Sequence, residues 1–520
     1  MTRIPRAILF ALLAALVAAP AIAAAPQANA GSAAVIPNWS QVSRVTDTVP
    51  TTQILAHAFT LRTSPLHDPL FRALRNLHTN DTRLQFWFSV TRAALPELKP
   101  PTATETFWDF QYMDPLVADY YANTTGKHHI NMGSIPRWMF NVPPANVPQD
   151  PAASSYAYTD GTRGDLLKDP SGKQFADYQV RLYEWYTKGG FTDELGHYHH
   201  SGHHYKIDYW GVLNEPDFEN HIDVQQYTRI YDAVTTAIHK IDPHVEFFGP
   251  EVSGAEIEWA KYFLDPKNHS PNALLPLEYF SFHNYVNAPN DPSTWHADYF
   301  TNPDSGPSDG ASADAFKQRI ETVMKIRDQL SPQTKVIVDE MGIFDVVKPG
   351  EEACRANEPY KAFNPLYWNA NGANWAVNFI NAEKLGLPLI SMSQMVGYPT
   401  QCPSIAMFDY TTAQPNAHYW ALWLINKNFG PGDKLIATRS TDPDLVAQAS
   451  ITPSGRKILL VNTTDRSIDV DLAGAYQSEG LSLEVVDQSS GEQQPQAQSV
   501  TGNHISLAPF AVAVVSGNAH

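Results

Sequence analysis

The chain has 520 residues, a formal net charge of −18 and 43% hydrophobic residues. Its basic residues are not clustered densely enough to hold a phosphate backbone, which argues against nucleic acid and anionic membrane surfaces as partners. The length is too great for one compact domain of ordinary size and suits a barrel followed by a smaller module.

Residues 1–30 have the pattern of a secretory signal peptide. Arg3 and Arg6 precede an apolar run from Ala7 to Ala19, and small residues follow that run. The run is too short to span a membrane, although a buried N-terminal helix is an alternative. We therefore expect a secreted or periplasmic protein with no membrane insertion after signal removal.

The two cysteines, Cys354 and Cys402, each follow a strand that we assign to the barrel. A disulfide between them would tie two neighbouring loops and would fit an oxidising compartment. The distance between the two Cα atoms cannot be read from the sequence, so two unconnected thiols remain the alternative.

Strand-like and helix-like segments alternate along most of the chain. Residues 33–49 come first as an extended segment that we expect to pair with the C-terminal module. We expect strands at 84–89, 129–133, 209–213, 244–248, 278–283, 335–340 and 389–395, a less certain first strand at 55–61, and helices at 113–123, 175–186, 223–241, 255–264, 314–330, 375–385 and 418–426. This alternation predicts a parallel sheet, and a count near eight predicts an α/β fold with a (β/α)₈ TIM barrel over residues 31–432.

The pattern changes at Gly430-Pro431-Gly432. Beyond these residues, short alternating strands are separated by turn residues such as Pro453-Ser454-Gly455. This predicts a C-terminal antiparallel β-sandwich over residues 433–520.

Two strands end in a glutamate. The strand from Tyr209 to Leu213 is followed by Asn214 and Glu215 and then by a proline, and the strand from Lys335 runs into Glu340. Barrels place their chemistry at the carboxyl ends of strands, and glycosidic bonds are cleaved by a pair of carboxyl groups. One such glutamate would more often be a salt bridge at the rim, but two of them three strands apart predict a catalytic pair.

The alternation of side chains selects between the two acids of the second strand. Val336, Val338 and Glu340 share one face, and Ile337 and Asp339 share the other. We expect Glu340 to face the pocket and Asp339 to lie behind it.

These motifs resemble the retaining glycoside hydrolases of clan A, whose barrels carry the acid/base on strand four and the nucleophile on strand seven. Within the clan the chain resembles glycoside hydrolase family 39, which includes β-xylosidases and α-L-iduronidases. The resemblance covers roughly residues 85 to 515 and is carried by Trp108–Tyr112 with Asp114, Tyr209–Asp217, Tyr227–Ile238, Phe280–Tyr285 and Pro415–Leu424.

The resemblance implies roles for individual residues. Glu215 would be the acid/base and Glu340 the nucleophile, with their carboxyl groups about 5 to 5.5 Å apart. Asn214 would bind the 2-hydroxyl of the sugar. His283 and Tyr285 would line the site, one of them orienting Glu340, although Tyr285 could equally be an aromatic of the rim. No cofactor and no metal would be needed.

The chain also departs from the family pattern. Strand two lacks the Arg-Phe-His-Gly motif of the family xylosidases, and strand eight ends in Ser393-Gln394-Met395, where an aromatic platform is usual. Trp138, after strand three, is a candidate to replace this platform in substrate binding; a buried core tryptophan is the alternative.

Asp193 to His204 contain five histidines and two acids. Such a segment could bind a transition metal. The alternative is a solvated, hydrogen-bonded loop, which we favour because the segment precedes its strand and would lie at the amino face of the barrel.

We therefore expect a retaining glycoside hydrolase that acts on an oligo- or polysaccharide, with β-xylosides as the default. A glycosidase of β-glucuronidase or β-galactosidase type within the same clan is one alternative. A catalytically silent carbohydrate-binding barrel is another, and a metal-dependent hydrolase built on the histidines is a third.

Overall fold

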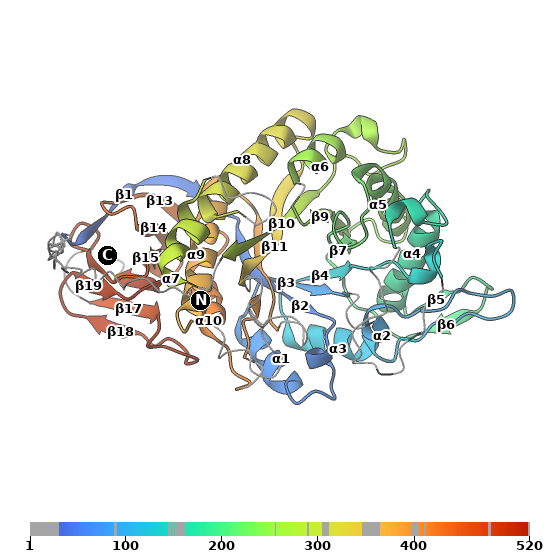
Figure 1. Ribbon diagram of the computed structural model, residues 1–520, viewed down its shortest axis with the longest axis horizontal. Coiled ribbons are helices and arrows are strands. Elements are labelled where there is room, and N and C mark those ends of the chain that lie inside the picture. Colours follow the sequence, from blue (N-terminus) through green and yellow to red (C-terminus); the bar gives the residue numbers. More distant parts are fainter. Residues whose placement is uncertain are drawn as a thin grey trace, which may run out of the picture.

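The computed structural model describes residues 31–87, 91–143, 147, 150, 162–254, 256–288, 291–303, 311–345, 364–396, 405–409, 412–476 and 480–517. It consists of a barrel and a C-terminal β-domain that forms one end of the molecule (Figure 1). The signal-like residues 1–30 and both cysteines, Cys354 and Cys402, lie outside the described residues.

The barrel is a closed sheet of parallel strands. The order around it is β8-β7-β4-β3-β2-β12-β11-β10-β9. Only Gly249 separates β8 from β9, and the two segments act as one strand, because β8 pairs with β7 while β9 pairs with β10. The strands are β2 (Val49–Leu55), β3 (Asp81–Gln85), β4 (Lys127–Met132), β7 (Tyr209–Val212), β8 (Glu246–Phe248), β9 (Pro250–Val252), β10 (Tyr279–Ala288), β11 (Lys335–Asp345) and β12 (Leu389–Met392). The predicted (β/α)₈ barrel is confirmed.

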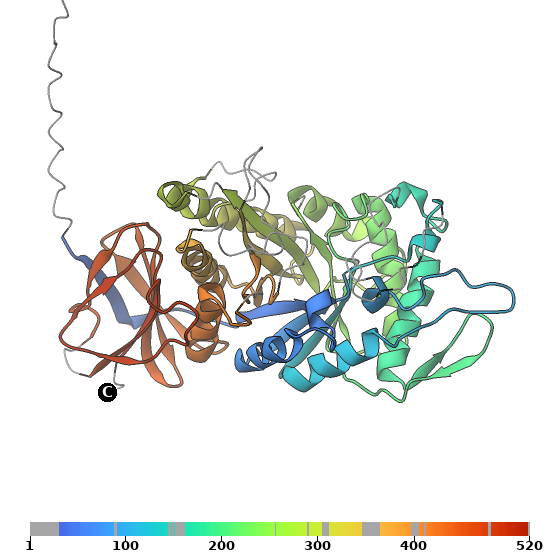
Figure 2. The same cartoon turned by 60° about the horizontal axis from the view of Figure 1, so that its bottom comes forward.

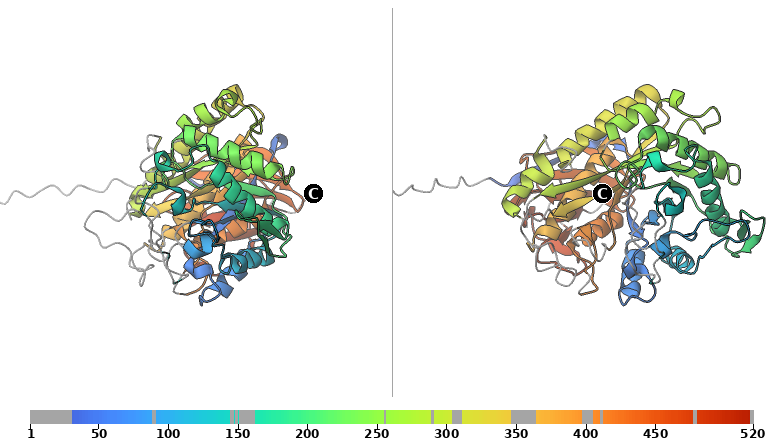
Figure 3. Two further views of the ribbon diagram at one scale, coloured as in Figure 1. Left: turned by 90° about the vertical axis from the view of Figure 1, so that its right-hand side faces the viewer. Right: turned by 45° about the vertical axis from the view of Figure 1, so that its right-hand side comes forward.

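Helices follow the strands and cover the outside of the sheet (Figure 3). They are α1 (His67–Asn76), α2 (Thr91–Ala94), α3 (Met113–Asn123), α4 (Lys173–Thr187), α5 (Val224–His239), α6 (Glu256–Phe263), α7 (Pro292–Trp295), α8 (Ala313–Leu330), α9 (Tyr367–Leu385) and α10 (Ala417–Asn428). In α5, Asp223 caps the first turn by accepting from the Gln226 N–H, and the apolar residues at three- and four-residue spacing are buried. None of the helices in the described ranges has the length and apolar character needed to cross a membrane.

Two predicted strands are displaced. The first strand is β2, not residues 55–61, where Ala58–Thr60 form a 3₁₀ helix instead. The strand was missed because Thr51, Thr52 and Gln53 are polar and nevertheless buried in β2. The second strand begins at Asp81 rather than Leu84 and therefore includes Arg83.

The β-domain is an antiparallel sandwich with its own core, as predicted. Its strand order is β18-β17-β20-β15-β14-β13-β1-β16-β19, and apolar residues such as Ile436, Ile458 and Val515 are enclosed within it. The strands are β13 (Lys434–Ser440), β14 (Leu445–Thr452), β15 (Gly455–Asn462), β16 (Ile468–Asp471), β17 (Leu481–Val486), β18 (Gln498–Val500), β19 (His504–Leu507) and β20 (Val512–Gly517).

The strand β1 (Ala33–Val45) completes this domain (Figure 2). It pairs antiparallel with β13 and parallel with β16, so the expected pairing of the 33–49 segment with the C-terminal module is confirmed. Although its residues fall within the 31–432 range assigned to the barrel, β1 belongs to the β-domain. The chain thus enters the sandwich, builds the barrel and returns to the sandwich.

The hydrophobic core of the barrel extends onto the face of the β-domain that packs against it. Phe510 of the β-domain is fully buried, and its ring centroid lies 5.8 Å from that of Trp295 and 6.3 Å from that of Phe300. Both partners belong to the segment that follows strand six, β10, which carries His283 and Tyr285. The β-domain therefore packs directly against the connection after this strand.

Candidate active site

Glu215 follows the carboxyl end of β7, and it meets Glu340 within β11, a strand that continues to Asp345 instead of ending at residue 340. β7 is the fourth strand of the barrel and β11 the seventh, counted from β2. One carboxyl oxygen of Glu215, one of Glu340 and one ring nitrogen of His283 all lie within 4.8 Å of one another. The structure thus brings together the two carboxylates that the sequence singled out.

Glu215 is held by His283. The Nδ1 atom of His283 lies 2.8 Å from Oε1 of Glu215, whose side chain is 13% exposed. Burial raises the pKa of Glu215 and the negative charge of Glu340 adds to that shift, while His283 opposes it; the net direction is upward. Glu215 is thus favoured as the protonated member of the pair.

Glu340 has the opposite surroundings. It accepts a hydrogen bond from Nη1 of Arg83 at 2.8 Å and another from the Tyr285 hydroxyl, whose oxygen is also 2.7 Å from Oγ of Ser393. Burial alone would raise the pKa of Glu340, but the positive charges of His283 and Arg83 and the bond from Tyr285 lower it overall. Tyr285 is therefore the residue that contacts Glu340 directly, while His283 contacts Glu215.

A bulge in β11 turns two consecutive acids towards the site. Phe282 of β10 pairs with Val338, but the next residue, His283, pairs with Glu340, so Asp339 is the extra residue. Glu340 does face the site, but it does not share the face of Val336 and Val338 as the simple alternation predicted. Those valines belong to the large core that includes the helices, whereas Ile337 packs with Tyr209 and Tyr279 of other strands across the barrel interior.

Asp339 follows the inward face of Ile337, and the bulge brings Glu340 inward as well. Oδ1 of Asp339 lies 3.4 Å from Nε2 of His283. Its other oxygen is 4.0 Å from Nε of Arg83. Asp339 thus lies behind the pair, as the sequence suggested, but it reaches this place from the inward face.

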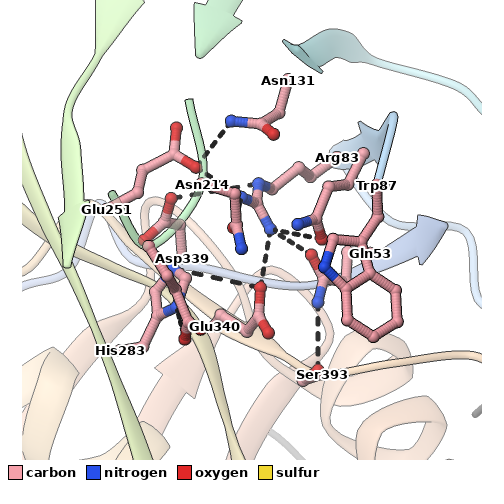
Figure 4. Close-up of polar contacts among 12 residues, drawn as sticks. Gln53, Arg83, Trp87, Asn131, Asn214, Glu251, His283, Asp339, Glu340 and Ser393 are labelled. Carbon is pink, nitrogen blue, oxygen red and sulfur yellow. Dashed lines mark hydrogen bonds and ion pairs between the residues drawn. The ribbon is translucent and has the colours of Figure 1, made fainter. Parts of the chain in front are cut away.

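Arg83 is the centre of the buried polar network (Figure 4). Besides Glu340, its guanidinium group donates to Oδ1 of Asn214 at 2.6 Å, to Glu251 and to the Gln53 side chain. The residue is 1% exposed. Sequence reasoning missed Arg83 because the strand was expected to begin at Leu84, one residue after it, whereas β3 begins at Asp81.

Glu251 is the second missed residue. It is fully buried, and its Oε2 accepts from Nδ2 of Asn131 at 2.7 Å as well as from Arg83. Gly211 makes room for this contact, because a Cβ there would lie 2.5 Å from both Asn131 Nδ2 and Glu251 Oε1. Glu251 is the central residue of the short strand β9, and nothing in the sequence indicates that its side chain points inward.

The backbone is strained at this site. Leu213, Glu215 and Glu251 have φ angles of 64°, 39° and 54°, in the left-handed region that side chains other than glycine rarely adopt. The Glu215 N–H donates to the Glu251 carbonyl at 3.0 Å and thereby joins two of these residues. Such strain gathers at functional sites, where the surrounding structure over-determines the conformation.

Asn214 lies between two charged groups. Its Oδ1 accepts from Arg83, and its Nδ2 donates to Oε1 of Glu219 at 2.9 Å. The same Glu219 oxygen accepts from Nε1 of Trp87 at 2.8 Å. Glu219 and Trp87 were not predicted, because Glu219 sits in a turn and Trp87 was expected within the strand at 84–89, which ends at Gln85 in the structure.

Trp138 is placed away from this cluster. Its indole N–H donates to the Glu97 carbonyl at 2.8 Å. Among the described residues, it lines a groove of about 290 Å³ with Met139, Lys173 and Glu194, and the residues of that groove include none of those that surround Glu215 and Glu340. Trp87 is instead the tryptophan that lies next to this cluster, because its indole N–H donates to Glu219.

The histidine-rich segment forms a small hairpin at the end of the molecule opposite the β-domain (Figure 1). It comprises β5 (Gly190–Thr192) and β6 (Tyr198–His200). Asp193 organises the turn by accepting from Nε2 of His199 at 2.9 Å and from the Thr106 hydroxyl at 2.8 Å. Within the described chain, the groups of three or more potential metal ligands lie instead around His283 in the barrel.

Those barrel groups, Glu215-His283-Glu340 and Glu251-His283-Asp339, have the donor atoms that a cation would need. However, the guanidinium group of Arg83 already lies against Glu251 and Glu340. Burial lowers the pKa of His283, but Glu340, Asp339 and Glu215 raise it well above its ordinary value. The network thus carries its own positive charge, and its donor set fits proton transfer between carboxyl groups better than metal binding.

Two comparisons concern the sequence. Residues 443–515 match a family model described as the C-terminal immunoglobulin-like domain of D-apionate lactonase. A β-xylosidase of Geobacillus stearothermophilus is 21% identical over 190 residues, which make up 36% of this chain and 32% of that protein. The match thus spans about a third of the relative's length.

Solved structures resemble the chain over nearly its whole length. An α-L-arabinofuranosidase of Thermotoga maritima in complex with arabinose is 14% identical, with a TM-score of 0.59 over 94% of this chain and 100% of that one. A family 51 α-L-arabinofuranosidase of Bifidobacterium longum is 13% identical, with a TM-score of 0.60 over 93% of this chain and 99% of that one. A family 30 endoxylanase of Clostridium papyrosolvens C71 is also 13% identical, with a TM-score of 0.53 over 94% of this chain and 100% of that one. The chain shares the barrel and β-domain fold of these arabinofuranosidases and of this endoxylanase.

Proposed function

We propose that the protein is a retaining glycoside hydrolase with Glu215 as acid/base and Glu340 as nucleophile. The observation that carries the proposal is the pairing of these carboxyl groups, with oxygens within 4.8 Å, in surroundings that raise one pKa and lower the other. Retaining enzymes hold their carboxyl groups about 5 to 5.5 Å apart, whereas inverting enzymes need about 6.5 to 9.5 Å to admit a water molecule.

The reaction proceeds in two steps. Glu215 gives its proton to the glycosidic oxygen while Glu340 attacks the anomeric carbon, so the bond to the leaving group breaks as the bond to Glu340 forms. Glu215, now ionised, takes a proton from water, whose oxygen attacks the same carbon and releases Glu340. His283 holds the Glu215 carboxyl group in place through its Nδ1 atom, and Arg83 with Tyr285 keeps Glu340 ionised and in place.

Asn214 is proposed to bind the 2-hydroxyl of the sugar in this site. Its Nδ2 has one N–H beyond the one that Glu219 accepts, and its Oδ1 is fixed by Arg83. We propose Trp87, rather than Trp138, as the aromatic wall of the sugar site.

A family 39-like activity on β-xylosides is the proposed default, as part of an oligo- or polysaccharide. The match to the β-xylosidase supports it over a third of that protein. The similar arabinofuranosidases and the endoxylanase make α-L-arabinofuranosides and xylan the next substrates to try. Because residues 1–30 have a signal-like pattern, we also propose that the protein is secreted or periplasmic.

The experiment is turnover of nitrophenyl β-xyloside, β-galactoside, β-glucoside, β-glucuronide and α-L-arabinofuranoside by the wild type and by Glu340→Gly, with azide added to the variant. We expect Glu340→Gly to be inactive and azide to restore turnover, giving a glycosyl azide of inverted configuration. Glu258→Gly is the matched control, since the Glu258 side chain is 76% exposed on α6. Glu258→Gly should turn over substrate at the wild-type rate. Exhaustive chelation of metal ions should leave the rate of the wild type unchanged.

The outcomes separate the alternatives. A Glu340→Gly protein that hydrolyses the glycosides as fast as the wild type would contradict the assignment of the nucleophile. A wild type that binds xylo-oligosaccharides but hydrolyses none of them would favour a silent carbohydrate-binding barrel.

A further inference from the structure

A third buried carboxyl group, Glu219, lies beside the two proposed catalytic ones. It is 6% exposed, and its Oε1 accepts two hydrogen bonds, from Asn214 at 2.9 Å and from Trp87 at 2.8 Å. Its Oε2 is buried without a hydrogen-bond partner among the described residues. The two-step reaction does not use this carboxyl group.

The backbone fixes Glu219 to the acid/base residue. Its N–H donates to the Glu215 carbonyl at 2.7 Å, and the Phe218 N–H donates to the same carbonyl at 2.9 Å. These bonds close a tight turn in which Phe218 is 64% exposed while Glu219 points inward. The position of Glu219 is therefore tied to that of Glu215.

The amide of Asn214 is held from both sides. Arg83 donates to its oxygen and Glu219 accepts from its nitrogen, so a flipped amide would lose both bonds. Of the two, Glu219 is the one that ties the amide to Trp87, because its Oε1 accepts from both side chains.

We propose that Glu219 is a positioning residue that couples the Asn214 amide to the Trp87 indole, and thereby selects glycosides that carry a 2-hydroxyl group. The inference rests on the proposed function and deepens it. One carboxyl oxygen sets both the polar contact with the sugar and its aromatic wall, so losing the oxygen releases both.

The chemistry of this carboxyl group gives a conservative variant. Burial, with the charge of Glu215, raises the pKa of Glu219 well above its ordinary value, which favours the neutral acid. Glutamine has the shape of the neutral acid and keeps the accepting oxygen. Glu219→Gln should therefore preserve both hydrogen bonds, and Glu219→Ala should lose them.

The test measures kcat and KM for the best nitrophenyl glycoside of the wild type and for its 2-deoxy analogue. For Glu219→Ala we expect kcat/KM on the 2-hydroxy substrate to fall about a hundredfold, as for a misplaced contact group, and to fall less on the 2-deoxy substrate, which loses only the aromatic wall. Glu219→Gln should stay near the wild type. Glu219→Ala should cost less in the Asn214→Ala background than in the wild type, and Glu258→Ala is the control.

A second readout does not depend on turnover. In indole N–H spectra of the ¹⁵N-labelled protein, with Trp87 identified through Trp87→Phe, Glu219→Ala should shift the Trp87 signal and Glu219→Gln should leave it nearly in place. An unmoved signal in Glu219→Ala would overturn the proposal, and so would equal losses on the two substrates. If the wild type hydrolyses no glycoside, the proposed function fails, while the Trp87 signal still decides whether Glu219 holds the indole.

Discussion

Replacing Arg83 by methionine tests the buried network directly. Arg83 is 1% exposed and is the cation that faces Glu251, Asp339 and Glu340. Methionine fills a similar volume but leaves these carboxyl groups without their partner and Asn214 without its donor. The substitution therefore removes a buried positive charge and leaves the cluster of buried carboxyl groups with excess negative charge.

The size of the effect follows from this loss. Removing one partner of a buried ion pair costs about 3–5 kcal/mol, because the remaining charge stays buried. The cost should fall when Glu251→Gln removes one of the stranded charges, with a coupling between the two substitutions of about 0.5–3 kcal/mol. Without Arg83, the folded-state pKa values of the carboxyl groups rise. A carboxyl group whose folded-state pKa is raised stabilises the protein at low pH, and this stabilisation is lost as the pH rises through that pKa. The loss of unfolding free energy in Arg83→Met, relative to the wild type, should therefore be larger at pH 8 than at pH 5.

The assay is guanidinium denaturation followed by tryptophan fluorescence at both pH values. Arg163→Met is the control, since Arg163 and Asp165 form a pair whose side chains are 56% and 66% exposed. Such a pair contributes at most about 1 kcal/mol. An Arg83→Met protein that unfolds at the wild-type denaturant concentration at pH 8, or that is less stable at pH 5 than at pH 8 relative to the wild type, would refute the reasoning.

Two further predictions concern activity and the domain contact. The pH profile of kcat/KM should be bell-shaped, because activity falls on the acid side as Glu340 gains a proton and on the alkaline side as Glu215 loses one. In Glu215→Gln, assayed with a substrate that has an activated aryl leaving group, the fall on the alkaline side should disappear. Phe510→Ala should destabilise the protein by about 3–5 kcal/mol, because the ring is fully buried between the barrel and the β-domain. Thermal unfolding with the exposed Phe218→Ala as control measures this loss, and equal melting of the two variants would contradict it.

The barrel and the two glutamates could be predicted because their signals are local. Alternating strands and helices gave the barrel, and strand-end acids gave Glu215 and Glu340. Asn214, adjacent to Glu215, came with them. The pairing of β1 with the β-domain was also correct, since an extended segment before the first helix has few other places to go.

The rest of the site depends on contacts that the sequence does not contain. Arg83 and Glu251 lie on different strands, and only the closed barrel brings them together. The bulge at Asp339 reverses the simple alternation, and nothing in Val338-Asp339-Glu340 marks it. Trp138 was a candidate for the sugar site from its place after strand three, but its indole N–H donates to the Glu97 carbonyl.

The placement of β1 means that two covalent connections join the barrel to the β-domain. One runs from β1 to β2 and the other from α10 to β13, and they are bonded to each other where they cross, with Thr46 N–H donating to the Asp433 carbonyl at 2.9 Å and Gly432 N–H to the Thr46 carbonyl at 2.8 Å. A single linker would act as a hinge, whereas a double one resists both bending and twisting. During synthesis, β1 leaves the ribosome before the barrel, yet its neighbour β13 follows only after the last barrel helix. The sandwich is thus the last part of the protein to close.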